Sequence, residues 1–141
     1  MWRLFSLIFL FNFFLNQLDS SLIKVSVDKK RVRTGEVFTY KVEMELPFNP
    51  QEIKLPKFEG LKVVSQSQRS SYNIKKDKII VKIKMVFKLV AYSPGKYVIK
   101  NIVVKGKNRV VKSEKVEIEV YGERIKDKEE KKKESEVQFT I

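Results

Sequence analysis

The chain has 141 residues, a formal net charge of +13 at pH 7, and neither cysteine nor histidine. This composition excludes thiol nucleophiles, disulfides and thiolate or imidazole metal ligands, and it removes the commonest general base. Carboxylates and lysines remain available for chemistry, so the composition argues against an enzyme only in part. The length allows one domain with additional segments.

Residues 1–21 are typical of a secretory signal peptide. Arg3 gives a positive start, and residues 4–15 are apolar except at two positions. Such a segment is too short to span a bilayer, which needs about 20 residues. We therefore expect export to the periplasm or cell envelope, with the leader either cleaved after Ser20 or Ser21 or retained as an attachment to the inner membrane. The alternative is a buried N-terminal hydrophobic segment.

Period-two alternation of apolar and polar residues, which indicates half-buried strands, runs from residue 23 to residue 72. It predicts a first strand at 23–27, a turn region at 28–36 and the clearest strand at 38–46, with one buried and one wet face. A short edge piece at 51–55 and a mostly polar strand at 62–72 follow.

The second half of the chain has the same character. A turn at 75–78 contains no glycine, which leaves its type open, and a long strand with one buried face covers 81–91. Pro94 and Gly95 suit the two central positions of a type II turn between antiparallel strands. The apolar phase slips by one residue at Asn101, which predicts a β-bulge. Gly106 then turns the chain into a last strand at 116–120.

About seven such strands with regular turns predict an all-β fold, an immunoglobulin-like antiparallel β-sandwich over residues 22–121. The same residues carry 23 basic and 10 acidic side chains, and therefore the whole net charge. The expected role of this excess is to place lysines toward solvent, where they keep edge strands from pairing with other chains. Contact with an anionic membrane surface is the alternative. Nucleic acid is not an expected partner, since an exported domain does not meet it and no basic motif is interleaved with aromatic residues.

Four segments in order, at 25–36, 55–64, 89–104 and 113–120, resemble the start of a BatD family protein. This family, named for aerotolerance in Bacteroides, comprises exported bacterial proteins with repeated immunoglobulin-like domains and a membrane anchor near the C-terminus. Its members are associated with membrane proteins that carry von Willebrand A-type domains and with a MoxR-type ATPase system. The resemblance implies a non-catalytic extracytoplasmic scaffold with no catalytic residues, cofactor, metal or small-molecule substrate.

Residues 122–141 form a charged tail. The mixed charges at 122–136 predict a solvated linker. Val137, Phe139 and Ile141 then alternate with polar residues, as if the first strand of a second domain began there. This pattern suggests a truncated or split family member.

Phe48, Phe58 and Leu61 are the candidate partner-binding residues, since they are apolar and lie in a segment punctuated by proline and glycine. Loops held by a rigid scaffold often bind partners. The alternative is an apolar plug over the open end of the core.

The sequence leaves two other function classes as alternatives. An exported carbohydrate-binding β-sandwich module would need an aromatic platform, and the tyrosines show no clustering in the sequence. An enzyme would need paired carboxylates of perturbed pKa. The strand phase turns Glu43 and Glu45 toward solvent, which leaves Glu59 and Asp77 as the other acids considered.

Overall fold

The computed structural model describes residues 22–126, and all their regular structure is β-strand. The predicted leader and most of the predicted tail lie outside these residues. The ten strands are β1 (Ile23–Val27), β2 (Arg31–Arg33), β3 (Phe38–Leu46), β4 (Glu52–Lys54), β5 (Lys62–Lys75), β6 (Lys78–Val90), β7 (Gly95–Ile99), β8 (Val103–Lys105), β9 (Val110–Lys112) and β10 (Val116–Tyr121). The described part contains no helix able to cross a membrane.

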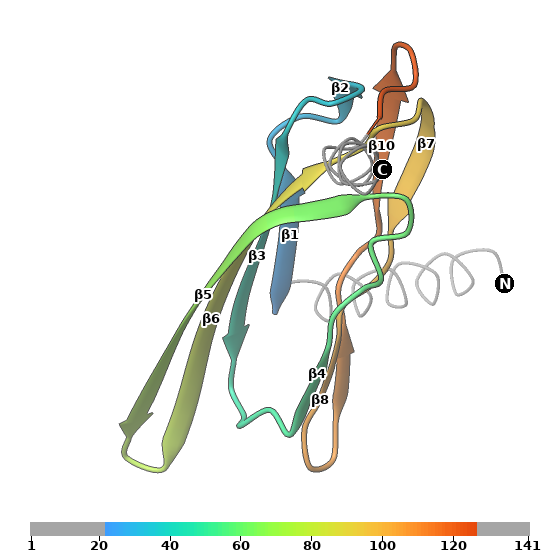
Figure 1. Ribbon diagram of the computed structural model, residues 1–141. Helices are drawn as coiled ribbons and strands as arrows, with labels where there is room; N and C mark the ends of the chain where they lie inside the picture. Colours follow the sequence, from blue (N-terminus) through green and yellow to red (C-terminus); the bar gives the residue numbers. More distant parts are fainter. Residues whose placement is uncertain (1–21, 127–141) are drawn as a thin grey trace, which may run out of the picture.

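The strands form one large sheet and two small ones. The large sheet has the order β1-β3-β6-β5, and the small sheets have the orders β2-β10-β7 and β4-β8-β9. Figure 1 shows the large sheet as one curved layer, with the two small sheets packed on one side of it. The all-β class is confirmed. The pairing is antiparallel except between β2 and β10, which run parallel.

The core lies between these layers, and β3 shows how the sequence builds it. Every second residue from Phe38 to Leu46 is buried, as the alternation predicted. The same phase of β6 supplies the neighbouring apolar row on the same face of the sheet, because Phe38 pairs with Leu89 and Leu46 pairs with Val81. Burial of these side chains is the main favourable contribution to folding.

The structure contains two short strands that the sequence pattern did not predict. β2 lies within the segment predicted as a turn, and β9 pairs with β8 in a hairpin ahead of the last strand. Each strand has three residues and one fully buried valine, Val32 or Val111. Three residues are too few for alternation to be distinguished from chance, so the charged neighbours dominated the pattern.

The run from 89 to 104 was predicted to be one hairpin with a bulge, and this was wrong. β6 and β7 belong to different sheets, so the connection through Gly95 crosses from one layer to the other. β7 ends at Ile99 and β8 begins a third sheet. The phase slip at Asn101 therefore marks a change of sheet. It is fixed by Ser113, whose Oγ accepts a hydrogen bond from the Ile102 N–H at 2.7 Å, while the Asn101 side chain donates to the Ser113 carbonyl.

The actual bulge lies in β5, where the register with β6 shifts between Val63 and Ser65. At the other end of this hairpin, Lys76 and Asp77 have φ values of 44° and 66°. Two consecutive residues with positive φ make a type I′ turn, which matches the right-handed twist of a hairpin. The turn type left open by the sequence is thus settled.

Candidate functional site

The most exposed element of the sheets is β5. It forms one edge of the large sheet, and thirteen of its fourteen residues are exposed. Among the edge strands within residues 22–126 it is the longest, since the other five have three to five residues. One row of backbone N–H and C=O groups along β5 is therefore directed away from β6, as in every edge strand.

The side chains of β5 explain why no second layer covers it. Buried residues of β6 such as Met85 and Phe87 pair with Gln68 and Gln66, which are polar. Between 63 and 74 the strand has a single charged residue, Arg69, and no proline. Its inner face borders a small hollow of ≈ 120 Å³ with Leu55 on the far side. β5 is thus held by backbone pairing far more than by burial.

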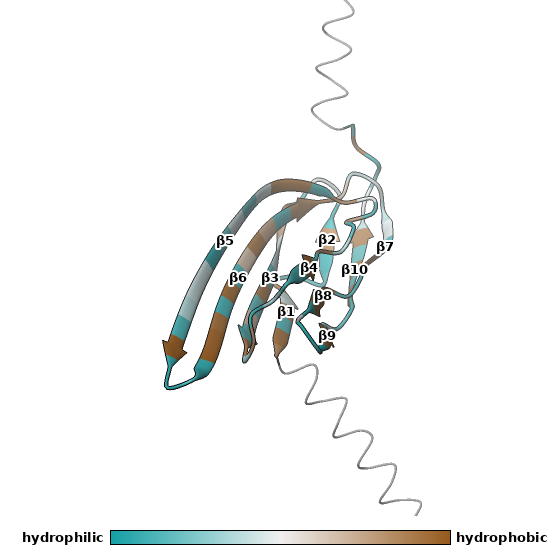
Figure 2. Ribbon diagram, turned by 90° about the horizontal axis from the view of Figure 1, so that it is seen from below, coloured by the Kyte–Doolittle hydropathy of each residue, from teal (hydrophilic) through white to brown (hydrophobic). Residues whose placement is uncertain are grey.

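The end of the β5–β6 hairpin projects beyond the rest of the sheet. β3 ends at Leu46, which pairs with Val81, so residues 73–80 have no third strand beside them. Three apolar residues there are exposed: Ile74 by 71%, Ile79 by 38% and Ile80 by 36%. Figure 2 shows this projecting end as two hydrophobic strand ends joined by a hydrophilic turn.

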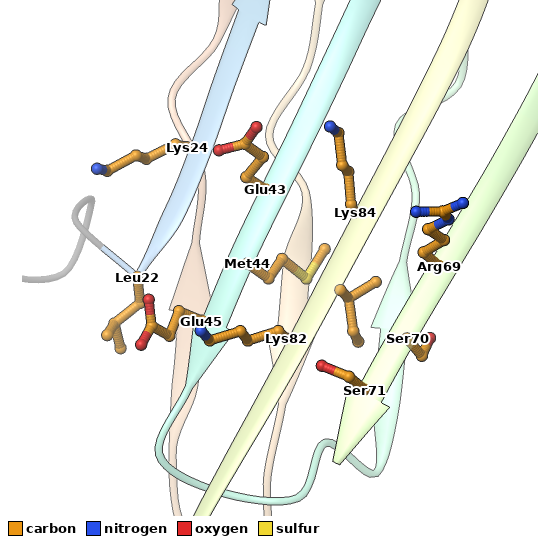
Figure 3. Close-up of a pocket in the computed structure, with 11 residues that line it drawn as sticks. Leu22, Lys24, Glu43, Met44, Glu45, Arg69, Ser70, Ser71, Lys82 and Lys84 are labelled. Carbon is orange, nitrogen blue, oxygen red and sulfur yellow. The ribbon is translucent and has the colours of Figure 1, made fainter. Parts of the chain in front are cut away.

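A larger hollow of ≈ 460 Å³ lies on the large sheet and is lined by side chains of its four strands (Figure 3). Its charged residues form cross-strand pairs: Glu43 pairs with Lys84, and Glu45 pairs with Lys82. On β5, Arg69 pairs with Lys84 from the other side. The hollow is a basic surface on the solvent side of the sheet, because these charged residues have the phase opposite to the core row.

A cluster of polar contacts fixes the approach to β3. The Glu36 carboxylate accepts a hydrogen bond from the Arg33 N–H at 3.0 Å and pairs with Lys29 Nζ at 2.8 Å. The Arg33 N–H and then Lys29 lower the pKa of Glu36, and Glu36 raises the pKa of Lys29. Asp28 Oδ1 accepts from the Thr39 N–H at 2.7 Å. These carboxylates serve backbone connections.

Tyr40 is the one tyrosine of the core. Its ring packs against Phe58 and Phe87, with centroids 5.9 and 6.1 Å away. The hydroxyl has no hydrogen-bond partner in the described part of the chain. Burial raises the pKa of Tyr40 to about 12.

The predicted partner-binding residues lie in two places. Phe58 is half-buried, with its ring 5.2 Å from that of Phe87, and Leu61 is buried, as expected of a plug. Phe48 is half-buried near Gly106 and lies under the Arg109 guanidinium, 4.8 Å from it. Both phenylalanines pack against the core, and Phe48 in addition contacts the β8–β9 turn. Binding of a partner by these residues stays a prediction.

The other candidate groups are also dispersed. Glu43 and Glu45 are exposed, Glu59 lies 4.0 Å from Lys100, and Asp77 is in the hairpin turn. No acidic cluster suited to a metal ion occurs within 22–126.

The tyrosines do not form a platform that could stack on a sugar. Tyr72 is exposed on β5, whereas Tyr121 is on β10 in another sheet, with its ring covered by Arg31 and Arg33.

The sequence did not predict the exposed edge of β5 or the end of the β5–β6 hairpin as a candidate site. The available signal was the contrast between β5 and its neighbours: a long strand-like run with few charges and apolar residues only near its ends. A single sequence shows that such a strand is polar, but the pairing order decides whether it lies at an edge.

Comparison with known proteins gives a family and a fold. A family profile described as the BatD DUF11-like domain matches residues 25–120. Among solved structures, the N-terminal domain of the Streptococcus gordonii adhesin Sgo0707 is similar, with a TM-score of 0.51 and 14% identity over 70% of this chain. The match spans 32% of that adhesin chain, and at this identity it shows the fold alone.

No curated protein matches the sequence. Neither match indicates a catalytic family. Since the profile covers most of the described residues, from β1 to β10, the chain belongs to the BatD family.

Proposed function

We propose that this chain is a non-catalytic interaction domain of the bacterial cell envelope, which binds an extended segment of a partner protein along the free edge of β5. The observation that carries the proposal is the edge itself: fourteen residues long and exposed at thirteen of them. An extended peptide can add a strand to such an edge, and its backbone hydrogen bonds supply affinity.

β5 differs from the edges that proteins protect. Protected edges are short, or they carry prolines, bulges or several charges. β5 has its bulge near Val63, at the start of the strand, and only Arg69 is charged between there and residue 74. The stretch 66–73 is regularly paired with β6 on its other side, so its backbone is already held in the conformation that an added strand requires.

The family supports a class of partner and a location. Resemblance to BatD proteins implies membrane partners with von Willebrand A-type domains, and the signal-like residues 1–21 favour export. We therefore propose that the domain acts in the periplasm or cell envelope, either free after cleavage or attached through its leader. The strand that β5 accepts would come from the extracytoplasmic part of such a membrane protein.

A proline scan from Gln66 to Ser71 tests strand capture. Successive amides of an antiparallel strand point alternately toward β6 and toward the free edge. Proline at an outward position removes a donor that only the partner uses, whereas proline at an inward position breaks the ladder with β6. We expect proline at the outward positions, which alternate along the strand, to abolish partner recovery from envelope fractions while leaving thermal unfolding unchanged.

The readout is photo-crosslinking from Ser67 on β5, with Ser26 on the opposite edge strand β1 as the matched control. The supporting result is recovery of a von Willebrand A-type membrane protein from Ser67 and not from Ser26. Equal crosslinking from both edges, or binding losses that follow thermal stability through the proline scan, would overturn the proposal.

A further inference from the structure

We propose that the end of the β5–β6 hairpin, residues 72–80, is a contact site for an anionic lipid surface. This inference concerns the turn end of the hairpin, beyond the residues 66–71 used to test strand capture, and it does not depend on that proposal. It starts from the shape of the molecule: three residue pairs, from Asn73 with Ile80 to Lys75 with Lys78, extend past the last residue of β3. At about 3.4 Å per residue this projection is about 10 Å long.

The projecting end has two chemically different faces. Alternation along the strands places Tyr72, Ile74 and Ile79 on one face, since Ile74 pairs with Ile79 and Tyr72 with Val81. Tyr72 is 64% exposed and Ile74 is 71% exposed. Ile74 and Tyr72 are thus mostly uncovered by residues 22–126, Ile79 beside them is 38% exposed, and a tyrosine next to isoleucines suits the boundary between lipid tails and water.

The opposite face carries the Asn73–Ile80 pair and, next to the turn, basic residues. Lys75 and Lys78 stand directly across from each other, and Lys76 lies in the turn beside the single acid Asp77. Like charges directly opposed on a hairpin destabilise it. An anionic surface would neutralise this pair, and lysine stems can extend along apolar groups to place their ammonium groups at phosphate level. Charge complementarity therefore favours lipid headgroups over a neutral protein surface as the occupant.

The depth also fits. Interfacial segments bury their apolar face about 5–10 Å into the headgroup and acyl boundary, which is the length of the projection. The type I′ turn keeps the two strands paired as far as Lys75 and Lys78, so the tip can enter the headgroup region as a closed hairpin. The long axis of β5 would then stand away from the membrane.

Binding of the full chain to vesicles tests the site. The probe is vesicles of phosphatidylcholine with about one-third phosphatidylglycerol, compared with pure phosphatidylcholine, because each lysine near an anionic surface contributes about fivefold in affinity. We expect the triple variant Lys75→Gln, Lys76→Gln, Lys78→Gln to bind the anionic vesicles about 100-fold more weakly. The matched control, Lys82→Gln, Lys84→Gln, Lys88→Gln, removes the same charge from the adjoining part of β6.

The apolar face is tested with an environment-sensitive dye. The chain has no cysteine, so Ile74→Cys gives a unique attachment point, and Val110→Cys labels an exposed valine of the β8–β9 hairpin as control. We expect a blue shift on anionic vesicles for the probe at position 74 and none at 110. Inorganic phosphate at the same ionic strength should leave both probes unchanged.

Four results would overturn the proposal. Equal weakening by the two lysine triples would show diffuse attraction by net charge. Blue shifts at both labelled positions would show non-specific adsorption, and a response of the position-74 probe to phosphate alone would show a simple anion site. Absence of wild-type binding to the anionic vesicles would refute the lipid contact directly.

Discussion

β3 and β5 lie on the two sides of the same strand, β6, and pair with it in the same antiparallel way. Yet β3 buries every second residue, whereas β5 exposes nearly all of its length. The contrast is sharpest at Leu89, which pairs with the fully buried Phe38 on one side and with the exposed Val63 on the other.

This difference shows that hydrogen-bonded pairing and burial are separate contributions. Both strands satisfy their backbone groups toward β6, but only β3 is packed beneath the small sheets. β5 consequently adds little apolar burial, and hydrophobic burial dominates stability. A strand that contributes little to the core can remain available for binding.

The largest difference in stability should appear between truncation of Phe38 on β3 and truncation of Val63 on β5. Phe38→Ala removes a fully buried ring and should lower the free energy of unfolding by about 3–5 kcal/mol. Val63→Ala, across the same Leu89, should cost less than about 1 kcal/mol because the valine is partly in water already. Denaturant unfolding of both variants measures the difference.

A comparable loss for the two variants would contradict the separation of β3 from β5. If Phe38→Ala prevents folding, Val42→Ala and Gln68→Ala give a milder version of the same test, because both residues pair with Met85. We expect about 2–3 kcal/mol for the valine and less than about 0.5 kcal/mol for the glutamine.

The sequence predicted the core strands well because each of them alternates over five or more residues. β3 and β6 are long enough for the pattern to be unmistakable, and the structure buries the phase that was expected. Alternation did not predict the strands in which a single valine is the only buried residue, as at Val32 and Val111. It also failed at Asn101, because a bulge and a change of sheet produce the same slip in phase.

The candidate surface was harder to predict than the fold. Its polarity was visible in the sequence, but edge position depends on the pairing order, which joins β5 to β6 and leaves the other side of β5 unpaired. The sequence instead favoured the apolar loop residues Phe48, Phe58 and Leu61 as a binding site. All three pack against the core, Leu61 within it and Phe48 and Phe58 half-buried against it. A single sequence does not distinguish an apolar loop residue that packs inward from one that binds a partner.

Tyr40 on β3 and Tyr72 on β5 give a second test. The buried Tyr40 hydroxyl lacks a hydrogen-bond partner within the described residues, so Tyr40→Phe should leave stability unchanged or raise it by up to about 1 kcal/mol. Tyr72→Phe should change it by less than about 0.5 kcal/mol. Destabilisation of more than about 1 kcal/mol by Tyr40→Phe would mean that the hydroxyl is satisfied.

The pH dependence follows from the raised pKa of Tyr40. A group whose pKa rises from 10.0 to about 12 on folding contributes stability below pH 10.0, and this is lost as the pH rises toward 12. The loss should be smaller in Tyr40→Phe. Unfolding measured at intervals across this alkaline range tests the expectation, with Tyr72→Phe as the control that retains it.

The hairpin turn should respond locally. Lys76 and Asp77 hold positive φ, which asparagine and glycine adopt more easily, so Lys76→Asn with Asp77→Gly should stabilise the hairpin end by about 0.5–1 kcal/mol. Amide hydrogen exchange at 73–80 should slow while the global unfolding midpoint stays unchanged. A shift of the midpoint would show that the hairpin end unfolds together with β3.

The smallest effect concerns acid, since carboxylates lie at the start of β3 and none lies in β5. The pKa of Glu36 is lowered from 4.5 by the Arg33 N–H and Lys29, so its contribution is present above pH 4.5 and is lost as the pH falls through the lowered value. Glu36→Gln should therefore show a shallower fall of unfolding free energy in that window. Hydrogen exchange at residues 66–73 of β5, which include no carboxylate, should show no matching change once it is corrected for the intrinsic effect of pH. If this stretch loosened in step with Glu36 protonation, the independence of β3 and β5 would fail, because an acid that titrates next to β3 would then be coupled to the uncovered edge strand.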